Sequence, residues 1–428
     1  MKKSGIIGLF AAIGVLIPAA FLVACGELPI SRDTTSQSVS QEIWIGSDQR
    51  FNSKIDESVL PAVEKARISF VTAGDNVIHP CIYMDAERRA AAQIAAGEKN
   101  IRKYNFKPTY VDVADYIASF DLAFINQETL MAGEEFGYSG YPTFNSPRDL
   151  AYDLAEIGFD IVNIANNHMC DKGTAGLNAT IDFWREVEEE TGVTMIGGYS
   201  DLDDLLNPRI IEREGVKIAL IGYAEMTNGN AKWKKDPLIP YTTEDNIDQV
   251  VANAKAAADV VIVSVHWGNE NWNTPTKEQK QLAQKFADLG VDAIIGHHPH
   301  VLQPIEWINS DDGTHKTICI YSLGNFISAM QSWQNMVGGF FTFDIVKMTD
   351  GSCFIDSPAF VPTVFYYGPS YFNSHVYFLD EYTDKLAKTH GTYNLYGSYA
   401  SVSDIEKYVK KIMGDYVSSE KNGGDADG

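Results

Sequence analysis

Short apolar runs alternate with amphipathic stretches along most of the chain, a pattern that predicts strands separated by helices. Buried strands are predicted at residues 68–73, 122–126, 161–164, 194–196, 260–265, 293–295, 317–321 and 340–346. Helices are predicted at residues 84–96, 110–119, 146–157, 175–190, 276–289 and 402–416. Ser146 and Pro147 favour a helix start, with serine as the cap. Strands that alternate with helices indicate an α/β architecture.

Residues 210–221 predict a β-hairpin within this pattern. Two strand-like segments flank Glu214 and Gly215, and glycine readily supplies the turn. A hairpin adds antiparallel pairs to a sheet whose other strands are joined through helices. The predicted sheet is therefore mixed. The chain has no repeat of fixed period, which argues against a repeat architecture.

The first 25 residues have the three parts of a secretory signal: a basic start, an apolar run over residues 6–24, and small residues before a cut. Leu22-Val23-Ala24-Cys25 resembles a bacterial lipobox, so we expect cleavage before Cys25 and lipid attachment to it. An uncleaved transmembrane anchor is the alternative, because the run is nearly long enough to span a bilayer. In both cases the bulk of the chain is expected outside the cytoplasm and tethered to the membrane.

Changes in composition divide the chain into four expected parts. Residues 1–25 are the signal peptide, and residues 26–66 are a polar, flexible linker. Residues 67–362 form the main α/β domain. Residues 363–428 are a C-terminal extension, rich in Tyr and Phe, with one helix and a polar, Gly-rich tail that is expected to be disordered.

Composition and charge exclude some classes of partner. A hydrophobic content of 45% and an aromatic content of 11% are sufficient for a large core. The net charge is −23 and no basic patch is visible, so nucleic acid is not an expected partner. An anionic substrate would need a local metal or arginine site. The cysteines Cys81, Cys170, Cys319 and Cys353 are widely spaced, so we expect neither a disulfide framework nor a zinc–cysteine site.

Side chains that can bind a metal follow five of the predicted strands. They are Asp75; Asn126 and Glu128; Asn167 and His168; His266; and His298 and His300. In α/β sheets the loops beyond the carboxyl ends of the strands bind ligands. Imidazole is the commonest side-chain metal ligand, and first-row metals accept mixed nitrogen and oxygen donors. The pattern therefore predicts a metal site assembled from several loops.

Each of these residues also has an ordinary structural explanation. Asp75 suits a turn or helix cap, His168 a loop, and His266 a core position beside Trp267. Taken together, these residues favour a metal site. Gly74 lets the chain turn before Asp75. Glu128 is placed to bridge two metals, with Asn126 orienting it.

Three histidines lie in the densest cluster, Gly296-His297-His298-Pro299-His300. Pro299 restricts the backbone, and in an extended chain His298 and His300 face the same side. Both then reach one centre. Two divalent ions about 3.5–4 Å apart are the usual arrangement for phosphoester hydrolysis.

Together these segments resemble the CapA family of capsule or poly-γ-glutamate synthesis proteins, a family similar to the calcineurin-like metallophosphatases. The resemblance covers roughly residues 67–330. The matching segments are Gly74-Asp75-Asn76, Asn126-Gln127-Glu128, Asn163 to His168, Val265-His266-Trp267-Gly268, Gly296 to Gln303, and Tyr321 to Phe326.

The resemblance implies a mixed β-sandwich flanked by helices, in four αββα layers, with divalent metal ions at one edge. Two ions are expected, of Mn, Fe, Zn or Mg. The implied ligands are Asp75, Glu128, Asn167, His266, His298 and His300, with His168 as the acid or phosphate-contacting residue. Metallophosphatases usually carry Asp-x-His in the first motif. Val77 stands at that position here, and His79 is the candidate replacement. Glu128 stands where they usually have Asp.

The resemblance also implies a role. The first interpretation is a membrane-anchored protein of capsule or poly-γ-glutamate synthesis with a phosphoesterase-like domain. An anionic surface polymer and capsule-synthesis membrane proteins are its expected partners. The second is a non-catalytic polymer export or assembly factor with the same fold. The third is a surface nucleotidase, in which the aromatic residues near 365–378 stack a base.

Overall fold

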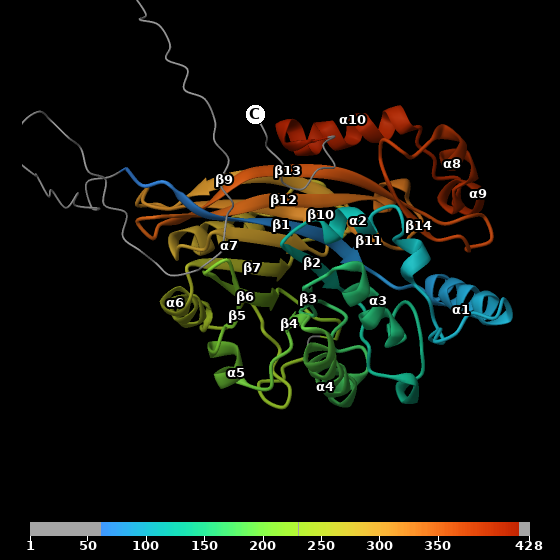
Figure 1. Ribbon diagram of the computed structural model, residues 1–428, viewed down its shortest axis with the longest axis horizontal. Helices are drawn as coiled ribbons and strands as arrows, with labels where there is room; N and C mark the ends of the chain where they lie inside the picture. The colour runs from blue at the N-terminus through green and yellow to red at the C-terminus, as the bar shows by residue number, and fades with distance from the viewer. Residues whose placement is uncertain (1–60, 230, 419–428) are drawn as a thin grey trace, which may run out of the picture. The chain divides into compact units, whose positions relative to one another are not determined.

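The computed structural model describes residues 61–229 and 231–418. Residues from Pro61 onwards belong to one compact unit. Figure 1 shows two β-sheets with helices around them. The predicted signal peptide with Cys25, most of the predicted linker and the end of the predicted tail lie outside the described residues. Within the described residues, no helix has both the length and the apolar character needed to cross a membrane.

The first sheet has eight strands and is mixed. Along its path lie β14 (His375–Phe378), β13 (Cys353–Tyr366), β12 (Val337–Met348), β1 (Glu64–Asn76), β2 (Leu122–Gln127), β3 (Ile161–Asn163) and β4 (Thr194–Ile196), and β11 (Asn325–Ile327) pairs with β1 off this path. The strands β1 to β4 are parallel, whereas β12, β13 and β14 add antiparallel pairs.

The second sheet has six strands. In order they are β5 (Arg209–Arg213), β6 (Val216–Ala224), β7 (Val260–His266), β8 (Ala293–His297), β10 (Lys316–Leu323) and β9 (Leu302–Asn309). The predicted hairpin is confirmed as β5 and β6. Its turn residues Glu214 and Gly215 have φ values of 46° and 73°, the left-handed conformation that two-residue hairpins require.

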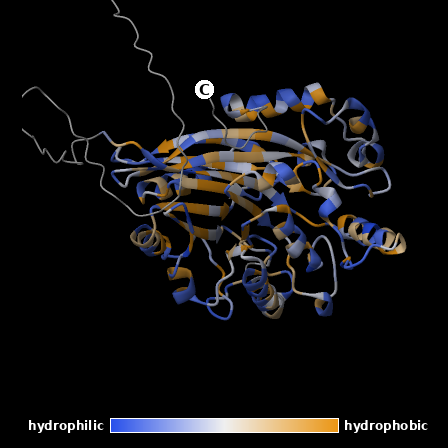
Figure 2. Cartoon of the chain, viewed as in Figure 1, coloured by the Kyte–Doolittle hydropathy of each residue, from blue (hydrophilic) through white to orange (hydrophobic). Residues whose placement is uncertain are grey.

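Alternation along the buried strands builds two cores. In β7, Ile262 packs into the larger core between the sheets, and Val261 and Val263 pack into a second core on the opposite face. Successive side chains of a strand point to opposite faces. The sequence of a strand that is buried on both faces is therefore a continuous apolar run. Figure 2 shows these strands as largely hydrophobic.

Helices cover the outer faces of the two sheets. The second sheet carries α6 (Ile247–Ala257) and α7 (Lys277–Asp288), whose Val250, Val251 and Phe286 pack into the second core. Beside the first sheet lie α2 (Ala114–Ala118), α3 (Asp149–Ile157) and α4 (Gly173–Thr191). The remaining α-helices are α1 (Pro80–Ala95), α5 (Leu202–Leu206), α8 (Asp384–Thr389), α9 (Gly391–Tyr396) and α10 (Val402–Met413). The predicted fold class, two mixed sheets flanked by helices, is confirmed.

Some predicted helix boundaries are wrong. Helix α3 begins at Asp149, and Ser146 does not cap it. The Ser146 hydroxyl instead lies 2.8 Å from the Thr129 hydroxyl, so a tertiary contact has replaced the local one. The helix predicted over residues 110–119 shrinks to Ala114–Ala118.

The C-terminal segment packs on the same core as the rest of the unit. The expected boundary at Pro362 falls within β13, and Tyr367 and Phe378 beyond it are buried in the core between the sheets. Helix α10 lies against this unit, where its Tyr408 contacts Trp333 and accepts a hydrogen bond from Asn273. Residues 363–418 therefore form part of the described fold.

The cysteines are isolated from one another. Cys81, Cys170, Cys319 and Cys353 are free thiols. Burial raises the pKa of Cys319, which lies in the middle of β10. These positions are those of packing residues.

A buried ion pair within α1 is hydrogen-bonded to the C-terminal segment at Ser374. The Asp85 carboxylate is fully buried and accepts hydrogen bonds from the Ser374 amide and hydroxyl, each at 2.9 Å. Arg89, whose side chain is only 15% exposed, lies 2.9 Å from the same carboxylate. Arg88 contacts it at 2.7 Å, but its side chain is half exposed. The attachment of residues near 374 to α1 therefore depends on Asp85.

We predict that Asp85→Ala lowers the free energy of unfolding by roughly 3 kcal/mol, because Arg89 then stays largely buried without its partner. Arg88→Ala is the matched control and costs at most about 1 kcal/mol, since an exposed pair contributes little. Urea denaturation measures both values. Equal losses in the two variants would contradict this assignment.

Candidate metal centre

Strand pairing brings the predicted site residues to one edge of the fold. Asp75 near the end of β1 is paired with Asn126 of β2 and with Asn325 of β11. In the second sheet His266 at the end of β7 is paired with His297 at the end of β8. The carboxyl ends of parallel strands from both sheets therefore meet here, as ligand sites in α/β proteins do.

Two glycines permit the close approach of these strands. A Cβ atom on Gly74 would lie 2.1 Å from the Gly324 carbonyl oxygen, and one on Gly296 would lie 2.1 Å from the Tyr321 carbonyl oxygen. The predicted reason for Gly74, a turn before Asp75, is wrong because Gly74 lies within β1. Its role is to let β11 approach, so that the Asp75 amide donates to the Gly324 carbonyl at 3.0 Å.

Asp75 is the most heavily hydrogen-bonded acid of the site. Its Oδ1 accepts from Asn126 Nδ2 at 2.9 Å and lies 3.1 Å from His297 Nδ1. Its Oδ2 accepts from the His298 amide at 3.2 Å and lies 3.2 Å from His300 Nδ1. Burial alone would raise the pKa of Asp75, but the hydrogen bonds from His297 and His300 lower it well below its usual range. Asp75 is therefore ionised.

The predicted role of Asn126 changes. Its amide orients Asp75 and not Glu128, because the register of β1 and β2 places the two side chains together. Asn163 of β3 extends this series of hydrogen bonds by donating to Asn126 Oδ1 at 2.9 Å. Three neighbouring parallel strands thus hold one carboxylate in a fixed orientation.

Glu128 is buried without any hydrogen-bond partner. Its side chain is fully inaccessible, and neither carboxylate oxygen is hydrogen-bonded by any described residue. The nearest imidazole nitrogen atoms to Oε1 are His300 Nε2 at 3.4 Å and His266 Nε2 at 3.7 Å. Burial raises the pKa of Glu128 well above its usual range. A buried acid left unpaired is costly, and a bound cation removes that cost.

The imidazoles converge on the same point. His266 Nε2 lies 3.0 Å from Asn167 Oδ1 and 3.0 Å from His298 Nδ1. Burial lowers the pKa of His266, and burial with the nearby His300 lowers that of His298 to about 3. Both rings are therefore neutral at physiological pH, the form in which histidine binds metals.

Three groups of donor atoms are close enough to hold a cation, with all atoms of each group within 4.8 Å of one another. They are Asp75, Glu128 and His300; Glu128, His266 and His298; and Glu270, His298 and His300. Glu128 belongs to two groups, which is the position of a bridging ligand. The structure brings together all six predicted ligands, since Asn167 contacts His266. The donor set of carboxylates and imidazoles fits divalent first-row ions. Burial alone would lower the pKa of His300, but the neighbouring Glu128 and Asp75 raise it to about 10, so this ring would release a proton when an ion binds.

The local geometry of the histidine loop differs from the prediction. His298 and His300 have φ values of 96° and 55°, so the backbone is left-handed and not extended. Such conformations cost about 1–3 kcal/mol each and cluster at functional sites. Asn325 Oδ1 lies 2.9 Å from His300 Nδ1, so the matching segment Tyr321 to Phe326 also contacts the site.

Two residues of this site were not selected from the sequence. His297 lies 3.1 Å from Asp75 at Nδ1, and its buried Nε2 has no partner. Glu270 is exposed and joins His298 and His300 in the third group. Its place after the predicted strand at residues 260–265 was the available signal, but exposed acids are too common for that signal to select it.

His168 lies next to Asn167 with a carboxylate behind it. Its Nδ1 is 2.7 Å from Asp171 Oδ2, and the Phe144 ring packs edge-on against the imidazole at 4.7 Å. A carboxylate only accepts, so this contact places the proton on Nδ1 and leaves Nε2 as the atom that exchanges a proton. An oriented histidine of this kind is suited to general acid–base chemistry.

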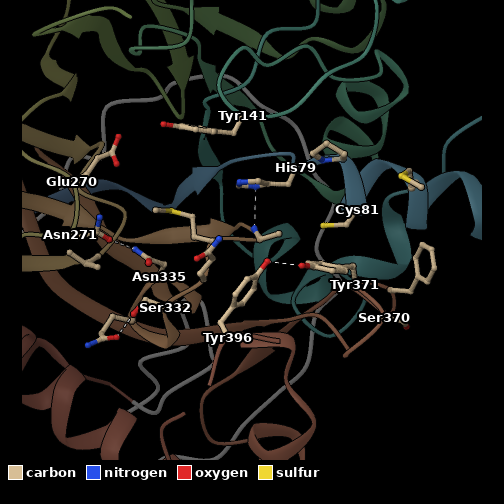
Figure 3. Close-up of a pocket in the computed structure, with 18 of the residues that line it drawn as sticks. His79, Cys81, Tyr141, Glu270, Asn271, Ser332, Asn335, Ser370, Tyr371 and Tyr396 are labelled. Atoms are coloured by element: carbon tan, nitrogen blue, oxygen red, sulfur yellow. Dashed lines mark hydrogen bonds between the residues drawn. The ribbon is translucent and has the colours of Figure 1, made fainter. Parts of the chain in front are cut away.

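His79, the candidate replacement for the missing first-motif ligand, does not join the three groups. The Ala329 amide donates to its Nδ1 at 3.1 Å. Burial lowers the pKa of His79 to about 4. The ring lies instead at the edge of a neighbouring cavity, as Figure 3 shows.

Comparison with known proteins identifies relatives of the chain. PGA biosynthesis protein CapA of Bacillus subtilis is 36% identical over 176 residues, which cover 41% of this chain and 44% of that protein. Capsule biosynthesis protein CapA of Bacillus anthracis is 35% identical over 179 residues, 41% of each protein. The alignments thus span less than half the length of these curated relatives.

Solved structures are more distant. A phosphatase from Mycoplasma pneumoniae aligns with a TM-score of 0.36 and 12% identity, covering 68% of this chain and 94% of that one. The NAD nucleotidase of Haemophilus influenzae aligns with a TM-score of 0.37 and 12% identity, covering 84% of this chain and 58% of that one. Scores this low support no inference.

The family profile described as bacterial capsule synthesis protein PGA_cap matches residues 48–330. This range contains every residue of the three donor groups. It also covers the segments on which the resemblance to CapA depends. The chain therefore belongs to the PGA_cap family of bacterial capsule synthesis proteins.

Proposed function

We propose that this chain is a metal-dependent hydrolase of the phosphoesterase type. Glu128 carries the proposal, because a fully buried carboxylate with no hydrogen-bond partner needs a cation beside it. Asp75, Glu128 and His300 would hold one ion, and Glu128, His266 and His298, with Asn167, a second. Bound divalent ions stabilise the charge of a phosphoryl group and lower the pKa of water.

The chain's own residues supply orientation and proton transfer. Asn163 and Asn126 hold the Asp75 carboxylate in place. His168 would present Nε2 for proton transfer to a leaving oxygen, while the Asp171 carboxylate orients the ring through Nδ1. Imidazole donors suit Mn, Fe and Zn better than Mg, so we propose one of the first three as the resident ion.

We further propose that the hydrolase acts in capsule or poly-γ-glutamate synthesis, at the extracytoplasmic face of the cell membrane. The names of its relatives support the process. The lipobox-like segment ending at Cys25 supports a lipid anchor. A phosphoester of the polymer pathway, or of its lipid carrier, is then the substrate, and membrane proteins of capsule synthesis are the partners.

A non-catalytic assembly role on the same fold is the second candidate. The observation that favours it is Val77, which occupies the position where a first-motif ligand is expected, while His79 joins none of the donor groups. Ion content and turnover separate the two candidates. An assembly factor requires neither bound ions nor catalytic turnover.

We predict that the purified protein binds about two divalent ions per chain by elemental analysis after incubation with Mn, Fe or Zn. An ion at one hundred times its dissociation constant adds roughly 2.7 kcal/mol to the free energy of unfolding. Glu128→Gln keeps the shape but removes the charge. We expect it to abolish most of this gain, while the metal-free variant is at least as stable as the metal-free parent.

Glu134→Gln is the matched control, since the Glu134 side chain is 70% exposed and belongs to none of the donor groups. It should leave ion content and ion-dependent stabilisation unchanged. Absence of bound ion after incubation with all three metals would contradict the hydrolase proposal and favour the assembly role.

We predict that His168→Asn lowers kcat for an alkyl phosphoester by roughly 10²- to 10⁴-fold, because the leaving alkoxide needs a proton. The loss should be much smaller for p-nitrophenyl phosphate, whose leaving group needs no acid. Ion content should stay at the parent value in elemental analysis. Equal losses on both esters, or loss of ion together with activity, would show that His168 has a structural role only.

A further inference from the structure

A cavity of about 1040 Å³ opens beside the candidate metal centre. Glu270 lines it and also belongs to the donor group with His298 and His300. Asn335 lines it too, and its Nδ2 donates to the His300 carbonyl oxygen at 3.0 Å. The volume reaches the upper range of small-molecule sites. A group attached to a phosphate at the metal centre can therefore extend into this space.

The two sides of the cavity differ in chemistry. Figure 3 shows Asn271 and Asn335 on one side, where their amides are joined by a hydrogen bond of 2.8 Å, and Tyr371 on the other. Asn273, Gln331 and Gln334 add further amides to the lining. Amide side chains both donate and accept, so this side matches a ligand rich in hydroxyl groups.

The aromatic side is one continuous wall. The hydroxyls of Tyr371 and Tyr396 lie 2.6 Å apart, so the two rings meet end to end and do not face each other across a gap. The Tyr371 ring is fixed from behind by the parallel Tyr367 ring, with centroids 5.8 Å apart. A wall of this kind offers a surface for one face of a ring, with hydroxyls beside it.

The lining carries almost no charge. Among the described residues that line it there is no lysine or arginine, and the acid is Glu270. A polymer with a carboxylate on every residue would find no lysine or arginine to pair with along this lining.

Met84, Val301 and Met330 add apolar surface to the lining. Asn271 already accepts from Asn335, and Asn273 already donates to Leu302 and Tyr408. A hydrocarbon tail would suit the apolar residues but would cover the remaining amide atoms, which costs free energy. An uncharged ring with many hydroxyls satisfies both sides.

We infer that this cavity binds the neutral sugar ring of a glycosyl phosphoester, with the ring stacked on the wall of Tyr371 and Tyr396 and its hydroxyls bonded to the amides. The inference rests on the proposed function, because hydrolysis at the metal centre defines where the phosphoryl group lies. It assigns a role to the aromatic C-terminal segment and to α9, which supply the wall. Poly-γ-glutamate itself is excluded from this cavity.

Saturation-transfer NMR on the full chain in detergent, treated with EDTA, tests the inference without any turnover. The probes are methyl glucoside and methyl N-acetylglucosaminide, with adenosine, farnesol and tetra-γ-glutamate as competitors of other classes. We expect saturable binding of at least one glycoside and weaker binding of the other three. Preferred binding of adenosine, farnesol or tetra-γ-glutamate, or no saturable binding of any probe, would overturn the inference.

Three variants locate the bound ring. Tyr396→Ala should weaken glycoside binding about tenfold, the upper range for loss of an aromatic contact. Tyr141→Ala also removes a lining ring, and Tyr141 is 80% exposed, so this variant should weaken binding without disturbing the fold. Tyr393→Ala is the control on the same helix, outside the cavity, and should bind as the parent does.

Unchanged affinity in both Tyr396→Ala and Tyr141→Ala would overturn the location. Failure of the proposed function would be seen separately, as absence of phosphate release from p-nitrophenyl phosphate by the ion-loaded protein. Glycoside binding by the metal-free chain does not depend on that result, so the two failures are distinguishable.

Discussion

The buried carboxylate of Glu128 is the constraint on which the site depends. A charge held away from water without a hydrogen bond costs several kcal/mol, so another favourable interaction must offset that cost in the folded protein. Neutral imidazoles of His266 and His298 lie beside it, and the one proton of His300, whose pKa Glu128 and Asp75 raise to about 10, does not neutralise both acids. A divalent cation does, and the need for one turns a cluster of polar residues in the protein interior into a candidate metal centre.

The pairing register of the strands places the donor atoms of the site in defined positions. Asp75 is positioned by pairing with Asn126 and Asn325 from strands on either side, and two glycines allow those strands to come close. The left-handed backbone at His298 and His300 directs both rings to the centre, at a conformational cost that the packed strands around them sustain. The two sheets therefore supply the rigid frame and the loop supplies the donors.

The proposed metal centre binds the phosphoryl group of the substrate, and the cavity binds the group attached to that phosphate. Its amide side comes from loops of the same sheets that hold the metal ligands, whereas its aromatic side comes from Tyr371 and from Tyr396 of α9. Hydrogen bonds from Ser374 to Asp85 and from Arg89 to the Ser374 carbonyl oxygen attach the segment near Ser374 to α1. Stability of that junction thus affects the shape of the cavity as well as the fold.

The sequence by itself determined most strands, most helices and the six candidate ligands, because strand periodicity and polar residues at strand ends are local signals. The strands β9, β11, β13 and β14 were not predicted. Tertiary structure alone decided that Asn126 orients Asp75, that Glu270 and His297 join the site, and that Ser146 bonds Thr129 instead of capping a helix. It also decided that residues beyond 363 line a cavity beside the histidines. Each of these depends on contacts between residues far apart in the chain, or on left-handed backbone imposed by packing, and periodicity carries no information about either.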